Sequence, residues 1–156
     1  MRSDQGWLGH GPLIVSLIAI YLGLHFALRL LLSPTLGIDD AEQILFAQQW
    51  AFGYRFRQPP LFTWLLLPVV EGLGPGVLAV SIVRYSLLAA TYGFLFLAAL
   101  HWIDDRRLAA LSVFSFSLIY VFAYYAHHDL THTTALGAMI AATLLVFARL
   151  SEEPRT

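Results

Sequence analysis

Two adjacent carboxylates, Asp39 and Asp40, follow directly after the first long apolar stretch of this 156-residue chain. A carboxylate in such a place can act as a general base, or it can cap the start of a helix. Asp39 together with Glu42 has the form of a capping box, which predicts a helix over about 40–52 with Gly53 just after its end. Capping does not account for Asp40, because two neighbouring carboxylates repel each other and lose hydration.

A second group of ionisable residues lies far along the chain, in the segment that runs from His127 to His132. Asp129 can cap the helix that follows, or it can line a site. His128 and His132 are four residues apart, which on one helix places both rings on one face at a spacing typical of metal ligands. The segment therefore predicts either a helix cap or a divalent-metal site that contains His128 and His132.

The composition is that of a membrane protein. The chain is 58% hydrophobic and only 12% charged, whereas soluble domains carry roughly 25% charged residues. Its mean hydropathy is +0.69. A net charge of −1 gives no electrostatic basis for binding nucleic acid. The absence of cysteine excludes disulfides and thiolate metal sites. We therefore predict an all-α integral membrane protein.

The apolar stretches predict where the helices cross. A transmembrane helix needs about 20 apolar residues, and the stretches that reach or approach this length are 12–32, 76–100, 108–126 and 132–150. A fifth stretch, 61–74, is too short, and Pro68 and Glu71 are expected to break it, which predicts an interfacial or re-entrant segment. The first stretch is too long for a signal peptide and is expected to be retained. We predict a single membrane domain over 1–156, with an exterior loop over 33–75.

The arginines predict the orientation of the spans. Four spans place both termini on one side, and the segments 33–75 and 127–131 on the other. Five arginines lie on the terminal side, against Arg55 and Arg57 in the first loop, so the positive-inside rule predicts cytoplasmic termini in the inner or plasma membrane. Arg29 and Arg84 lie inside predicted spans. For Arg84 we expect either a side chain that extends to the interface or one that binds a phosphate or carboxylate.

The order of these residues resembles the polyprenyl-phosphate-sugar-dependent glycosyltransferases of the GT-C class. This group includes protein O-mannosyltransferases and the aminoarabinose transferases that modify lipid A. The resemblance covers about residues 10–150, and the chain looks like the N-terminal portion of such an enzyme. The matching residues are Asp39-Asp40, Gly53-Tyr54, Gln58-Pro59-Pro60-Leu61, Trp64-Leu65, Arg84 and Asp129.

The resemblance implies a reaction and a set of roles. A sugar moves from a polyprenyl-phosphate donor to a glycan, lipid or protein acceptor at the exterior face, with inversion at the anomeric carbon. Asp39 takes the position of the catalytic carboxylate, with Asp40 beside it, and serves as general base for the acceptor hydroxyl. Cationic groups steady the departing phosphate. The implied substrate-binding residues are Asp129, Arg84, Tyr54, Gln58 and Arg57. No cofactor is assigned, and a divalent metal stays an alternative.

Two departures limit the resemblance. The aminoarabinose transferases place Glu-Lys before the proline, where this chain has Arg57-Gln58, so the metal-binding Glu and donor-contacting Lys of that branch are not carried over. Enzymes of this family also have many more spans. Two other functions stay open: a small transport or metal- and proton-binding protein, and a non-catalytic membrane subunit. Transporters hold polar groups near mid-membrane, whereas those of this chain gather at one surface, which favours the enzyme.

We predict that the 156-residue chain does not turn over alone, because four spans supply one wall of a cavity and the missing C-terminal half would complete it. The purified chain, incubated with a polyprenyl-phosphate sugar and candidate acceptors, is expected to transfer no sugar above a protein-free control. Transfer by the chain alone would contradict this expectation.

Overall fold

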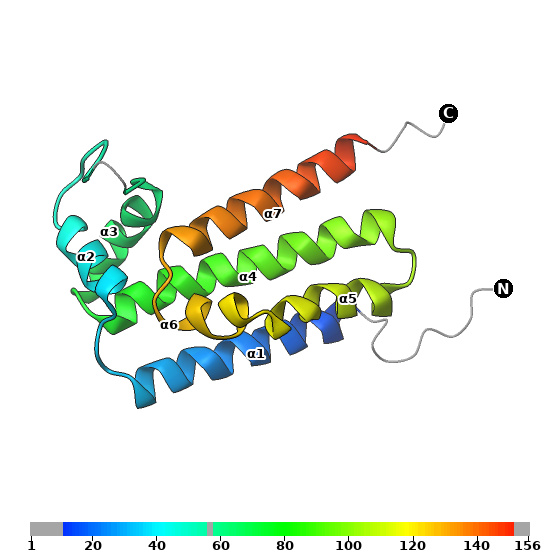
Figure 1. Cartoon of the computed structure of the whole chain (residues 1–156), viewed down its shortest axis with the longest axis horizontal. Coiled ribbons are helices and arrows are strands. Elements are labelled where there is room, and N and C mark those ends of the chain that lie inside the picture. Colours follow the sequence, from blue (N-terminus) through cyan, green and yellow to red (C-terminus); the bar gives the residue numbers. More distant parts are fainter. Residues whose placement is uncertain (1–10, 56–57, 152–156) are drawn as a thin grey trace.

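The computed structural model describes residues 11–55 and 58–151 (Figure 1). These residues form helices and connecting turns, and no strand occurs among them. Three helices are long and apolar enough to cross a membrane: α1 (Gly11–Leu32), α4 (Val77–Trp102) and α7 (His132–Leu150). Their bounds lie close to the predicted ranges. The chain is an all-α integral membrane protein, as its composition predicted.

The span predicted over 108–126 is not one straight helix. It consists of α5 (Arg106–Phe114), the 3₁₀ turn η2 (Ser115–Leu118), the π-helical turn η3 (Val121–Tyr125) and the short α6 (Ala126–His128). Its two halves are bent by 81°. The hydroxyls of Ser115 and Ser117 donate to backbone carbonyls three residues earlier. Such bonds compete with the helical ladder, and these two lie just before the break between Leu118 and Val121.

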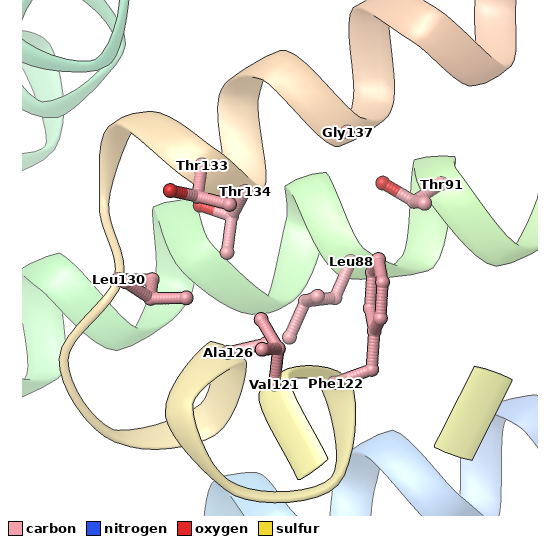
Figure 2. Close-up of a pocket in the computed structure, with 9 residues that line it drawn as sticks. All are labelled: Leu88, Thr91, Val121, Phe122, Ala126, Leu130, Thr133, Thr134 and Gly137. Carbon is pink, nitrogen blue, oxygen red and sulfur yellow. The ribbon is translucent and has the colours of Figure 1, made fainter. Parts of the chain in front are cut away.

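The bend leaves a very small cavity where the broken span meets α4 and α7. Figure 2 shows side chains of all three segments around it, among them Phe122, Thr91 and Thr134. Its volume is about 10 Å³, which is at the lower limit for a single water molecule. The cavity is therefore a packing defect beside the bend and has no room for a sugar.

The first exterior loop carries two helices whose bounds differ from the predictions. Helix α2 (Ile38–Phe46) begins after Gly37, so Asp39 lies in its first turn and is not its N-cap. It ends at Phe46, well before Gly53. The capping box does not form because Gly37, and not Asp39, is the N-cap, and the Glu42 carboxylate accepts hydrogen bonds from Arg55 and Gln58. Carboxylates in a first turn are still stabilised by the helix dipole.

Helix α3 (Leu61–Leu73) continues through Pro68, so the predicted break at Pro68 and Glu71 is wrong. The prediction that this stretch is too short to span is confirmed. Its 13 residues extend for about 20 Å, and the hydrocarbon core of a bilayer is about 30 Å thick.

Helix α4 lies at the centre of the bundle, with α7 along one side and α1 along another (Figure 1). The face of α7 that packs on α4 is built from small side chains, with Ala135, Ala138, Ala141 and Ala148 all buried. Small residues allow two membrane helices to approach closely. The opposite face of α7 exposes large apolar side chains such as Ile140 and Phe147, as expected of a helix surrounded by lipid.

The connections between helices gather at the two ends of the bundle. The start of α1, the α4–α5 turn and the end of α7 lie at one end (Figure 1). Helices α2 and α3 and the α6–α7 connection lie at the other end. The structure thus brings together the two loops that hold Asp39 and Asp129. Which side of a membrane this end faces stays a prediction.

Candidate functional site

The buried centre of the loop end is an ion cluster around Asp40. Asp40 is only 1% exposed, and its carboxylate lies between Arg29 of α1 and Arg84 of α4. Oδ2 accepts from Arg29 Nη2 at 3.2 Å, while Oδ1 accepts from Arg84 Nη2. Both arginines are buried as well. Charge-assisted bonds of this kind are the strong ones among protein hydrogen bonds, so this cluster fixes the start of α2 against two spans.

Other N–H groups of the two arginines donate hydrogen bonds to the backbone of both loops. Arg29 donates to the connection between α1 and α2, and Arg84 donates to the connection between α6 and α7. The accepting carbonyl oxygens belong to Ser33, Thr35, Leu130 and His128. The fully buried Arg84 is therefore occupied by protein groups. The predicted substrate-binding role of Arg84 and the catalytic role of Asp40 stay predictions.

Asp39 has a different environment from its neighbour. Its side chain is partly exposed, and its backbone N–H donates to Asp129 Oδ1 at 3.3 Å. The same Asp129 oxygen packs against Gly37, where an added Cβ would lie 2.2 Å from it. Gly37 thus permits the contact between the two loops, and the structure brings together Asp39 and Asp129 from positions 90 residues apart.

The electrostatic environment suits Asp39 to take up a proton. Partial burial raises the pKa of the Asp39 carboxyl, and the negative charge of Asp129 raises it further. Charge on His132 lowers this pKa, while Asp40 and Glu42 raise it. Among the described residues, Asp39 has no ion-pair partner. A carboxylate whose pKa lies above the usual range, and which no cation neutralises, is the kind of group that acts as a general base.

Tyr54, predicted to bind substrate, has its hydroxyl engaged within the loop. The hydroxyl donates to the carbonyl of Gln49 at 2.8 Å and accepts from the N–H of Ala51 at 3.3 Å. Its ring stacks on Phe46, with centroids 5.3 Å apart. These contacts close the turn after α2, so Tyr54 shapes the loop in this arrangement.

Gln58 and Arg55 both donate hydrogen bonds to Glu42. Gln58 Nε2 donates to Glu42 Oε2 at 2.6 Å, and Arg55 Nη1 donates to Glu42 Oε1 at 2.8 Å. The Arg55 side chain is 73% exposed. Gln58 Oε1 is buried with no hydrogen-bond partner in the described part of the chain, so it can still accept a bond. Arg57 lies outside the described residues.

The predicted metal pair rested on one shared helix face, and this premise is wrong. Helix α6 ends at His128 and α7 begins at His132, with a turn between them. His128 stacks on Tyr124, and His132 faces Gln43. Over 11–55 and 58–151, no three His, Asp, Glu or Cys side chains form a group that could hold a metal ion. The divalent metal stays a prediction.

His127 is directed to α1. Its Nε2 lies 3.1 Å from the hydroxyl of Tyr21, and its ring stacks on His25 with centroids 4.2 Å apart. This imidazole belongs to the packing between α6 and α1, so it does not join His128 and His132.

Three residues of the site were not predicted from the sequence: Arg29, Gln43 and Thr63. An arginine within a predicted span is a functional candidate by itself, and this signal was available for Arg29. Gln43 and Thr63 carry no such signal. Their contacts join residues that are 20 and 89 positions apart, so only the tertiary structure reveals them.

Two curated relatives match this chain. The lipopolysaccharide core galacturonosyltransferase RgtA of Rhizobium johnstonii (strain DSM 114642 / LMG 32736 / 3841) is 35% identical over 138 residues, which is 88% of this chain and 28% of the relative. The lipopolysaccharide core galacturonosyltransferase RgtB of the same organism is 33% identical over 153 residues, which is 98% of this chain and 30% of the relative. The chain is similar to glycosyltransferases over nearly its whole length.

The matched region is a minor part of the relatives, because the chain spans 28% and 30% of their lengths. No protein-family model matches the chain. No solved structure matches it either. The similarity to two glycosyltransferases agrees in reaction class with the resemblance drawn from the Asp39-Asp40 pair and the residues that follow it.

Substitution of the two adjacent carboxylates is expected to change stability by very different amounts. Asp40→Asn removes the anion between two buried arginines, which is expected to lower the free energy of unfolding by about 3–5 kcal/mol. Asp39→Asn changes a partly exposed side chain without an ion pair and is expected to stay within about 0.5 kcal/mol of the wild type. Unfolding of both variants in detergent micelles tests this, and equal losses would contradict the assignment.

Proposed function

We propose that this chain forms part of a membrane glycosyltransferase in which Asp39 is the general base. The proposal rests on the different ion pairing of the two neighbouring carboxylates. Two arginines neutralise Asp40, while Asp39 has no ion-pair partner among the described residues and lies beside Asp129. Similarity to two galacturonosyltransferases over 88% and 98% of the chain supports the reaction class.

The proposed reaction transfers a sugar from a polyprenyl-phosphate donor to an acceptor hydroxyl. Asp39 accepts the hydroxyl proton as the acceptor oxygen attacks the anomeric carbon from the side opposite the phosphate. A carbon–oxygen bond to the acceptor forms, and the bond between the anomeric carbon and the phosphate oxygen breaks. The electron pair of that bond leaves with the phosphate, and the proton ends on Asp39. A raised pKa makes Asp39 a better proton acceptor in this step.

The phosphate of the donor needs a cationic partner, and Arg55 is the best candidate among the described residues. Arg84 is fully buried, and protein oxygens accept from its nitrogens. Arg55 is exposed, and the ion pair that it makes with Glu42 lies at the surface, where such pairs are weak and easily exchanged. We therefore propose Arg55 as a phosphate ligand, and Arg84 and Arg29 as residues that position the loop.

The relatives and the arginine distribution support a proposal for the sugar, the acceptor and the membrane face. The names of RgtA and RgtB support galacturonic acid as the sugar and the lipopolysaccharide core as the acceptor. The excess of arginine at the other end of the bundle supports cytoplasmic termini and a site on the exterior face. The other proposed partners are membrane lipids and a C-terminal half that would complete the cavity.

Asp39→Asn in the complete enzyme is expected to lower the rate of sugar transfer by about 10²–10⁴-fold, the contribution typical of a general base. The measurement is transfer from a polyprenyl-phosphate sugar, with folded protein quantified for each variant. Asp104→Asn is the matched control, since Asp104 is exposed and lies in the α4–α5 turn at the opposite end of the bundle. Transfer at the wild-type rate by Asp39→Asn would remove Asp39 from the base role.

A further inference from the structure

Three helices of the loop end are joined by two consecutive side-chain hydrogen bonds. Thr63 Oγ1 on α3 donates to Gln43 Oε1 on α2 at 2.6 Å. Gln43 Nε2 lies 3.2 Å from Nε2 of His132, the first residue of α7. Thr63 and Gln43 are 1% and 0% exposed. In this orientation the oxygen and the nitrogen of the buried Gln43 amide both have partners, which avoids the free-energy cost of buried polar groups without hydrogen bonds.

This orientation determines the tautomer of His132. An amide oxygen can only accept, so the Thr63 hydroxyl must donate to it. The amide NH₂ of Gln43 can only donate, so His132 Nε2 must accept and carries no proton. The proton of the neutral ring is then on Nδ1. That nitrogen is buried and has no hydrogen-bond partner in the described part of the chain, which leaves its N–H available.

The ring lies beside the face of α2 that carries Asp39. Asp39 and Gln43 are four residues apart on one helix and therefore share a face, and His132 contacts Gln43 from α7. The charged groups that interact with His132 are Asp39 and Glu42 of α2. Helix α3 contributes the uncharged Thr63, through Gln43, and the ring of Phe62, whose centroid is 6.4 Å away. Arg84 of α4 holds the preceding loop at its carbonyl oxygens.

We propose that Thr63, Gln43 and His132 form a relay of positioning residues, which keeps the His132 proton on Nδ1 and so gives the Asp39 side of the site a neutral hydrogen-bond donor. The relay rests on the proposed function in one respect, namely that Asp39 is the base it serves. A donor beside a carboxylate favours its ionised form. The other tautomer would turn a lone pair toward the same region and repel the carboxylate, so the tautomer decides the sign of the interaction.

The relay is tested by ¹⁵N NMR of the histidine rings in the full chain, held in lipid nanodiscs near pH 8, where an ordinary imidazole is neutral. In the wild type, His132 Nε2 is expected to give the signal of an unprotonated acceptor nitrogen and Nδ1 that of a protonated one. Gln43→Glu is nearly isosteric and can only accept, so the expected result is a proton on Nε2. A proton on Nε2 in the wild type, or an unprotonated Nε2 in Gln43→Glu, would overturn the proposal.

Thr63→Val tests whether the relay acts on Asp39. Without the Thr63 hydroxyl the Gln43 amide can turn, and both His132 tautomers are expected to appear. The pH midpoint at which the Asp39 carboxyl ¹³C signal titrates is expected to rise, because a donor beside the carboxylate favours its ionised form. Thr63→Ser keeps the hydroxyl and serves as the matched control, with both readouts at their wild-type values.

An unchanged tautomer and midpoint in Thr63→Val would overturn the relay. Neither readout involves sugar transfer, so the two proposals fail separately. An active Asp39→Asn enzyme would remove the proposed function and leave the NMR result unaffected.

Discussion

The buried contact between Asp40 and the guanidinium groups of Arg29 and Arg84 is the constraint on which the loop end of this protein depends. A buried charge without a partner is costly, and one carboxylate with two arginines leaves an excess of positive charge. Backbone carbonyl oxygens of both loop connections accept further hydrogen bonds from the two arginines, and Arg29 Nε has no partner in the described part of the chain. These ion pairs and hydrogen bonds form together only when α1, α2, α4 and the α6–α7 connection are all in their folded positions. The cluster therefore stabilises this one arrangement of the loop end.

The cluster also explains why two carboxylates stand side by side. Consecutive residues of an α-helix point about 100° apart, so the first turn of α2 can bury one carboxylate and direct its neighbour elsewhere. Asp40 forms ion pairs with both arginines. Asp39 lies beside Asp129 and has no ion-pair partner among the described residues. The rigid attachment of Asp40 thus sets the position of Asp39. A general base needs such a fixed position at least as much as it needs a suitable pKa.

Much of the architecture follows from apolar length alone, because a bilayer imposes the same requirement on every span. This requirement predicted α1, α4 and α7, and it placed Asp39 and Asp129 at one end. Local details did not follow. Asp39 satisfies the pattern of an N-cap, yet the helix begins after Gly37, and the dipole also stabilises Asp39 in the first turn. No proline or glycine marks the bend after α5 in the sequence, and the partners of Arg84 come from distant segments.

The coupling free energy between Asp40 and Arg84 tests most directly whether their buried ion pair stabilises the loop end. A double-mutant cycle would compare Asp40→Asn, Arg84→Gln and the double variant by unfolding in detergent micelles. A cycle between Glu42 and Arg55 would serve as the surface control, for which less than about 1 kcal/mol is expected. We expect the double variant to lose less unfolding free energy than the two single losses added together, by about 1–3 kcal/mol. Additive effects at Asp40 and Arg84 would contradict it.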